Sequence, residues 1–263
     1  MVYGSADELL LMLNLSRIEL ENWADAILKD FLKDDYEAFA PINIEKLATE
    51  YLGLNLFYEN LSDNLDIYGV SAFQDTIIEI KRNGESEHLY VKANTILIEA
   101  ELQSKALTPI RRFTIGHEAA HQILRRLEYQ SNKRFDDPQF VTMFNKSTSS
   151  TVRFDLTEWQ ANTLCAALIM PSRLIDECMF RFGNKAKITV YGEEQLDFED
   201  SLFIDNIKSF LGVSKTALLI RLKQLNYVEY KPIGEYAEKR NIERMKMLLW
   251  QERIRVLNRQ KKT

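Results

Sequence analysis

Two of the three histidines in this 263-residue chain lie four positions apart, in His117-Glu118-Ala119-Ala120-His121. If this segment is an α-helix, the two histidines share one face, one turn apart. Both imidazoles can then bind one metal ion, and zinc suits them at Zn–N distances of about 2.0–2.1 Å. Glu118 would lie beside the open face of the metal, where it can act as a general base on a bound water. The alternative is a pair of surface histidines on an ordinary amphipathic helix.

The residues around this segment favour a helix that packs against a core. Residues 113–116 (Phe-Thr-Ile-Gly) precede the first histidine and residues 123–124 (Ile-Leu) follow the second, which places apolar side chains at helical spacing. Thr108 and Pro109 predict where the helix begins, because proline is favoured in the first helical turn. The two histidines are therefore expected on a rigid, packed element.

The third metal ligand should be a carboxylate. No His-x-x-Gly-x-x-His continuation follows the first motif, so an all-histidine site of that type is excluded. Glu128 lies seven residues beyond His121, about 10 Å along the helix axis, which is too far to reach the same metal. Asp136 and Asp137 lie beside Pro138 in a polar stretch, where a ligand is hard to hold rigidly.

Glu158 is the acid that the sequence favours. It begins an apolar segment, residues 158–171, that predicts a buried helix ending at or just before Pro171. A carboxylate at the start of such a helix is otherwise out of place, although favourable charge placement in a first helical turn is the alternative explanation. Asn162 follows at i+4 on the same face, where its side chain could hydrogen-bond a ligand imidazole and orient it.

These residues resemble those of a known family, the ImmA/IrrE metallopeptidases. The resemblance rests on the Phe-Thr-hydrophobic-small-His-Glu-x-x-His helix at 113–121 and on the Glu-x-x-Ala-Asn helix ending Met-Pro at 158–171. A weaker element, Val-Ser followed by an Arg-Leu-x-x-Leu helix, matches residues 211–225, and the whole resemblance spans about residues 40–228. Two positions depart from the family pattern: Ala120 replaces a glycine, and Cys165 replaces an alanine.

The resemblance implies a soluble zinc endopeptidase whose protein substrate is a transcriptional repressor of the helix-turn-helix type. Such enzymes typically act in the control of mobile elements or stress genes. It implies Zn²⁺ as the cofactor, held by His117, His121 and Glu158, with Glu118 as the catalytic base and Asn162 behind the ligands.

Composition agrees with a folded cytoplasmic protein. The chain is 46% hydrophobic with a net charge of −5, and its two cysteines, thirteen apart in apolar helical surroundings, indicate core residues in a reducing compartment. The N-terminus lacks the basic start of a secretory signal, and no apolar run approaches a membrane span. We therefore expect no membrane partner.

The predicted fold is α+β, with a zincin-like core, a small β-sheet beside the metal-binding helices, and a helical C-terminal region. Strands are expected at 75–81, 88–93 and 95–100, and a short helix over 42–53. The expected divisions are an N-terminal helix at 1–38, the metallopeptidase core at 39–180, a helix-turn-helix-like region at 181–230 and a basic helical tail at 231–263. Residues 129–157 look polar and irregular, which favours a mobile flap near the cleft.

A DNA-binding regulator with a structural or vestigial metal site is the competing hypothesis. Residues 201–226 show the pattern of a helix-turn-helix, two predicted helices joined by a short turn, with Lys215, Arg221 and Lys223 on the second helix. Residues 231–262 carry ten Lys and Arg against four Glu, so residues 1–230 carry about −11. An acidic body argues against general attraction to DNA. DNA binding is therefore not expected, and the basic tail is more consistent with a helix that pairs with an acidic partner.

Overall fold

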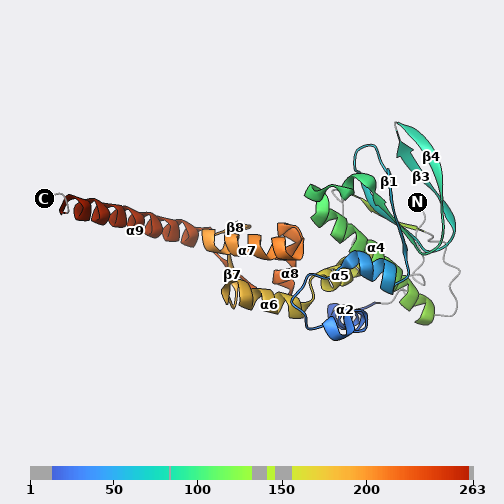
Figure 1. The fold of residues 1–263 in the computed structure, drawn as a ribbon, viewed down its shortest axis with the longest axis horizontal. Helices are drawn as coiled ribbons and strands as arrows, with labels where there is room; N and C mark the ends of the chain where they lie inside the picture. Colours follow the sequence, from blue (N-terminus) through green and yellow to red (C-terminus); the bar gives the residue numbers. More distant parts are fainter. Residues whose placement is uncertain (1–13, 83, 132–140, 146–155, 261–263) are drawn as a thin grey trace.

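The computed structural model describes residues 14–82, 84–131, 141–145 and 156–260 (Figure 1). The main helices are α2 (Arg17–Leu32), α3 (Ile44–Lys46), the π-helical turn Leu47–Tyr51, α4 (Thr108–Ser131), α5 (Leu156–Ile169), α6 (Ser172–Gly183), α7 (Phe198–Leu211), α8 (Lys215–Gln224) and α9 (Ile233–Gln260). The strands are β1 (Asn55–Glu59), β2 (Ile67–Ala72), β3 (Thr76–Arg82), β4 (Glu85–Val91), β5 (Thr95–Glu99), β6 (Val141–Asn145), β7 (Ile188–Tyr191), β8 (Gln195–Leu196) and β9 (Val228–Lys231). The fold is mixed α+β, as the sequence predicts.

The central sheet has the strand order β1-β5-β2-β6. Strands β1 and β5 are parallel, whereas β2 runs antiparallel to both of its neighbours, β5 and β6. The sequence predicts an irregular loop over 129–157, but residues 129–131 end α4, residues 141–145 form β6 and residues 156–157 begin α5, so over these residues that prediction is wrong. The rest of the expected flap at 132–140 and 146–155 lies outside the described residues.

The core lies where helices α2, α4 and α5 pack beside this sheet. Every residue from Thr114 to Leu124 on α4 is buried, and so is all of α5 from Thr163 to Ile169. Helix α2 is capped by Ser16 and Glu19 in a capping box, and it packs through Leu20, Ala24 and Leu28. The two helices that carry the motif residues are therefore fixed on several sides.

A two-stranded hairpin, β3–β4, extends from the main sheet and has its own small apolar cluster. Ile78 and Ile80 of β3 and Val91 of β4 pack there against Val70 on the face of β2 that is turned away from α4. The expected strands at 75–81 and 88–93 correspond to this hairpin, and the expected strand at 95–100 corresponds to β5.

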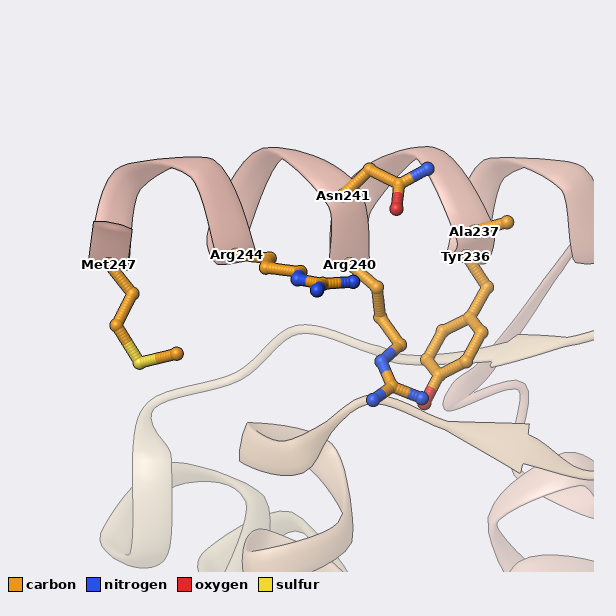
Figure 2. A pocket seen from close by; sticks show the side chains of 6 residues that line it. All are labelled: Tyr236, Ala237, Arg240, Asn241, Arg244 and Met247. Atoms are coloured by element: carbon orange, nitrogen blue, oxygen red, sulfur yellow. The ribbon is translucent and has the colours of Figure 1, made fainter. Parts of the chain in front are cut away.

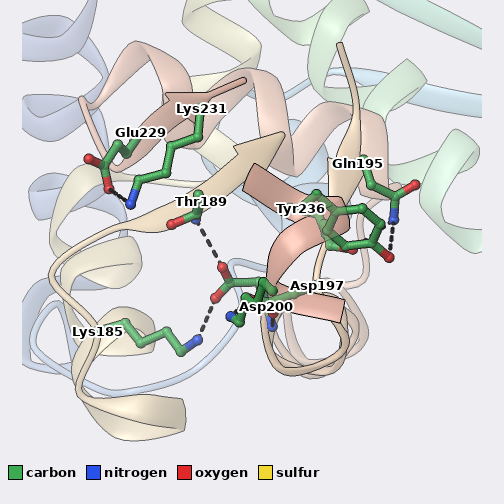
Figure 3. A network of polar contacts seen from close by, with 10 residues as sticks. Lys185, Thr189, Gln195, Asp197, Asp200, Glu229, Lys231 and Tyr236 are labelled. Atoms are coloured by element: carbon green, nitrogen blue, oxygen red, sulfur yellow. Dashed lines mark hydrogen bonds and ion pairs between the residues drawn. The ribbon is translucent and has the colours of Figure 1, made fainter. Parts of the chain in front are cut away.

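The C-terminal half contains helices α6, α7 and α8 and a second sheet of order β8-β7-β9. Polar contacts join its elements (Figure 3): Asp200 accepts from the Lys185 ammonium and from the Thr189 N–H at 2.9 Å. Asp197 caps α7 through the Asp200 N–H at 2.8 Å and pairs with Lys239 of α9 at 2.5 Å. These contacts hold the first turns of α9 on the body.

Beyond those turns, α9 projects away from the body (Figure 1). The described side chains from Asn241 to Arg253 are all exposed, including the apolar Leu249 and Trp250. An open hollow of about 640 Å³ runs along the start of α9 (Figure 2) and is lined by α9 side chains: Tyr236, Ala237, Arg240, Asn241, Arg244 and Met247. Helices α6, α7 and α8 lie between it and helices α4 and α5 (Figure 1). Of the helices that the structure describes, none is long and apolar enough to cross a membrane.

Arg221 on α8 joins the helix pair α7–α8 to the core through buried polar contacts. The Arg221 side chain is 0% exposed; its Nε donates to the Met170 carbonyl at 2.8 Å, and its guanidinium forms a bidentate pair with Glu21 of α2. The sequence offers Arg221 as a possible DNA-contacting residue, and that reading is wrong. This charge faces inward and joins the N-terminal helix to the end of α5.

Candidate metal centre

Helix α4 positions His117, Glu118 and His121 in its most buried stretch. The three residues are exposed by 0%, 0% and 2%. The helix begins at Thr108, as expected, and its apolar side packs on the sheet and on α5. The two imidazole rings lie one turn apart with their centroids separated by 4.6 Å. The i, i+4 geometry expected from the sequence is therefore present.

Helix α5 brings Glu158 and Asn162 to the same place from a segment about forty residues later in the chain. Close approach of the two helices depends on Gly116, where an added Cβ would lie 2.8 Å from Ile169 Cδ1 and 3.0 Å from Cys165 Sγ. A side chain at position 116 would force the Ile169 and Cys165 side chains to shift. The Glu158 side chain remains 39% exposed, and Asn162 is also exposed, so solvent reaches the centre from the α5 side.

Three ligand atoms meet between the helices. The Nε2 atoms of His117 and His121 are 3.0 Å apart, and the Glu158 carboxylate oxygens lie 3.3 Å from His117 Nε2 and 3.1 Å from His121 Nε2. Ligands of a tetrahedral ion with bonds of about 2.0–2.1 Å are separated by about 3.3 Å along each tetrahedron edge. Among the described residues, the ligand atoms of His117, His121 and Glu158 all lie within 4.8 Å of one another, a spacing that could hold a metal ion.

Protonation also suits metal binding. Burial is the largest influence on His117 and lowers its pKa, which keeps the imidazole neutral near pH 7 with a lone pair to donate. Burial alone would raise the pKa of Glu158, but hydrogen bonds with His117 and His121 outweigh it and leave that pKa well below its usual value. The centre therefore presents a neutral His117 imidazole and an ionised Glu158 carboxylate.

Asn162 supports one of the imidazoles. Its Oδ1 lies 3.1 Å from His117 Nδ1. If Nδ1 carries the proton and donates it to this amide oxygen, His117 Nε2 keeps its lone pair directed at the other two ligand atoms. The bond thus selects the tautomer that a metal ligand needs.

Strand β2 passes very close to Glu118, a contact that sequence reasoning missed. An added Cβ at Gly69 would lie 2.6 Å from Thr114 Cγ2 and 3.1 Å from both Cγ and Oε1 of Glu118. Gln122 donates from α4 to the Ser71 hydroxyl at 2.9 Å and to the Ala72 carbonyl at 3.0 Å, which fixes β2 against the helix. A glycine within an otherwise strand-like run was the available signal of such a close approach.

Neither Glu128 nor the third histidine of the chain, His88, joins this centre. Glu128 pairs with Arg125 on α4, with 3.6 Å between charged atoms. His88 is exposed on β4 and lies opposite Glu79 on the hairpin, away from the sheet that packs on α4. Asp136 and Asp137 lie outside the described residues.

Two histidines and a glutamate on crossing helices beside a small sheet define a zincin-like metallopeptidase centre. The chain belongs to the IrrE N-terminal-like domain family of peptidases, whose model matches residues 49–223. A search of curated proteins gives no match. The resemblance expected from the two motif helices is thereby confirmed at the level of the family.

Proposed function

We propose that this protein is a zinc-dependent endopeptidase that hydrolyses peptide bonds of a helix-turn-helix transcriptional repressor. The observation that carries the proposal is the meeting of His117, His121 and Glu158 at tetrahedral spacing, with Glu118 next to the first ligand. A metallopeptidase is the class that the family supports. Zinc, the repressor substrate, the cytoplasmic location and the divisions at residues 38, 180 and 230 remain parts of this proposal.

The chemistry divides among few residues. Zinc held by His117, His121 and Glu158 would supply a Lewis acid that polarises a carbonyl and lowers the pKa of water toward about 7. Glu118 takes the proton of the attacking water on its carboxylate and passes it to the leaving amine. Because Glu118 is 0% exposed, its charge acts in a weakly screened environment, where electrostatic interactions are strong.

The competing DNA-reader hypothesis gains nothing from the structure. A recognition helix must direct side chains at base edges or phosphates. On α8, Arg221 is committed to Glu21 and Met170, which leaves Lys215 and Lys223 as the exposed cations named by the sequence. Helices α7 and α8 act in this proposal as a packing unit.

Replacing Glu118 by Gln tests the role of the base directly. Gln keeps size and polarity but cannot take the proton, so bound zinc should be retained while proteolysis falls about 10²–10⁴-fold. Zinc per chain is measured by metal analysis. Cleavage is followed by gel and mass spectrometry on a helix-turn-helix repressor encoded beside this protein, with and without a chelator.

The matched control is Glu128→Gln on the same helix, which should leave both zinc content and cleavage unchanged because Glu128 pairs with Arg125 and not with the centre. If Glu118→Gln lost its zinc as readily as His117→Ala, the division between base and ligand would be wrong. Zinc binding without cleavage of any co-encoded repressor by the unmodified protein would count against the substrate.

A further inference from the structure

The outer edge of β2, the strand next to Glu118, is occupied by a segment of the same chain. Strand β2 is the sheet strand that touches the base, through Gly69. One edge of β2 pairs with β5, and the other pairs antiparallel with β6, in the register Gly69↔Phe144, Val70↔Met143, Ser71↔Thr142. Among the described strands, β6 forms the edge of this sheet on the β2 side, and β1 forms the opposite edge.

Distance decides which edge a substrate must use. A general base has to lie within about 2.6–3.2 Å of the proton that it takes, or one water away. Neighbouring strands are separated by about 4.8 Å, so a peptide paired directly with β2 lies one spacing from Gly69, close enough for one water to bridge it and Glu118. A peptide added outside β6 would lie two spacings away, about 10 Å from Gly69, and could not place its scissile carbonyl beside Glu118.

The burial of the metal centre is consistent with an edge of β2 that β6 occupies. His117, Glu118 and His121 are at most 2% exposed, whereas Glu158 and Asn162 on α5 are open to solvent. Small molecules can therefore approach from α5. An extended peptide on the side of β2 would meet the backbone of β6.

The ladder between β2 and β6 is short and interrupted. Strand β6 has five residues, and its pairing with β2 shifts register between Ile67 and Gly69, beside the base. Such a bulge leaves one residue out of the ladder and locally disrupts the pairing. A strand paired on a single edge over so few residues is among the easier parts of a sheet to displace.

We propose that β6 is an internal competitor for the substrate-pairing edge of β2, so that the peptidase is held closed until a substrate strand displaces residues 141–145. The proposal rests on the proposed peptidase function and adds its regulation. It also specifies the substrate form, an extended segment that pairs with β2 by backbone hydrogen bonds, in the manner of strand addition.

Two proline variants of β6 test whether the edge of β2 can be opened, and one of the two acts as the control for the other. In an antiparallel pair, consecutive residues point their N–H groups alternately toward and away from the partner strand. Of Thr142→Pro and Met143→Pro, therefore, one removes a ladder hydrogen bond to β2 and the other removes an outward N–H. Loss of one such bond should raise the open fraction about three- to tenfold in one variant and leave the other close to the unmodified protein.

A disulfide variant closes the edge reversibly. Ala72 and Val141 are register partners, and direct partners across a strand pair have the Cα separation that a disulfide needs, about 4.4–6.8 Å. The protein's own Cys165 and Cys178 are buried and should not compete. Ala72→Cys/Val141→Cys should block peptides when oxidised and regain unmodified behaviour when reduced. The comparison uses one folded protein in two states, so it stands even if a proline variant fails to fold.

The readout is ligand binding to the Co²⁺-substituted protein, followed by its visible absorption, with two probes. Acetohydroxamate is small enough to enter from α5, whereas a tripeptide hydroxamate must lie along β2. The expected result is tripeptide binding that rises in one proline variant and falls in the oxidised disulfide form, with acetohydroxamate binding unchanged throughout.

Equal or weaker tripeptide binding in both proline variants, together with no effect of oxidation, would overturn the proposal and assign β6 to the scaffold. Failure of the unmodified protein to bind Co²⁺ would instead remove the peptidase function, and this regulation with it.

Discussion

The metal centre and the Arg221 cluster are both buried groups of polar side chains, and they differ in how their charges are matched. At Arg221, hydrogen-bond donors meet acceptors: a guanidinium faces a carboxylate and a backbone carbonyl. At the metal centre, two imidazole nitrogens and a carboxylate, all suited to donate lone pairs to a cation, converge on one point at 3.0–3.3 Å. The first arrangement is complete by itself, and the second is shaped for an ion.

This difference separates structure from chemistry in a chain where sequence alone does not. Both clusters join segments that are distant in the chain. The metal centre includes a residue of α5, and the Arg221 cluster includes Met170, the residue directly after α5. Burial of a charged group is therefore not a sign of function in itself, because a matched pair can be purely structural. Convergence of several lone-pair donors on one point is the more informative sign.

Loss of a metal ligand should produce the largest effect. His117→Ala removes one of the three converging ligands and Glu158→Gln replaces the anionic ligand by a neutral amide, and binding of structural zinc is worth roughly 10 kcal/mol or more. Loss of several kcal/mol of zinc affinity is expected in both variants by competition with a chromogenic chelator. His88→Ala is the matched control and should bind zinc like the unmodified protein, since His88 is exposed on β4. Normal affinity in Glu158→Gln would remove Glu158 from the centre.

Removing Arg221 should affect stability and leave the metal in place. Arg221→Met leaves the Glu21 carboxylate, whose side chain is 23% exposed, and the Met170 carbonyl without their partner. Removing one partner of a buried ion pair lowers the free energy of unfolding by about 3–5 kcal/mol, and chemical denaturation would measure this loss. The double variant Arg221→Met/Glu21→Leu should recover much of that loss. A parallel loss of zinc affinity under native conditions would show that the two clusters are coupled.

Asn162→Ala should have a smaller, local effect. His117 Nδ1 would lose the amide oxygen that lies 3.1 Å away, and with it the preference for the ligating tautomer. Partners of this kind typically contribute about 10–100-fold in metal affinity or activity. Asn162→Asp keeps an acceptor at the same place and should restore most of the zinc affinity. Equal losses in both variants would mean that the contact with His117 is not what matters at this position.

The elements that sequence reasoning identified are those with local signals. Helices α4 and α5 follow from apolar spacing and from their proline boundaries, and His117 with His121 follows from helical periodicity. Glu158 could be reached because an acid at the start of an apolar helix is conspicuous. The structure brings all three together, which supports the ligand assignment made from spacing.

The features that were missed depend on partners far away in the chain. Arg221 looks like an exposed cation until Glu21, 200 residues earlier, is brought to it. Strand β2 holds glycine, serine and alanine as well as apolar residues, and its pairing with β6 joins segments about seventy residues apart. Neither strand shows the alternation of apolar and polar residues that marks a half-exposed strand. Their strand conformation depends on their pairing with each other, which neither segment reveals alone.

The smallest effect is expected on α8, and it separates the peptidase from the DNA reader. Lys215 and Lys223 are exposed, and Lys223 lies 5.3 Å from the Tyr230 ring centroid. Lys215→Ala/Lys223→Ala should leave repressor cleavage intact and change stability by only about 0.5–1 kcal/mol, since exposed charges and cation–π contacts contribute little. A DNA reader would behave differently, because phosphate contacts dominate its affinity, which falls steeply with salt and with the loss of two lysines. Gel-shift titrations over the adjacent promoter at two salt concentrations distinguish the cases. Tight, sequence-selective binding by the unmodified protein, weakened by the double substitution, would make α8 a functional surface and break the contrast with the metal centre.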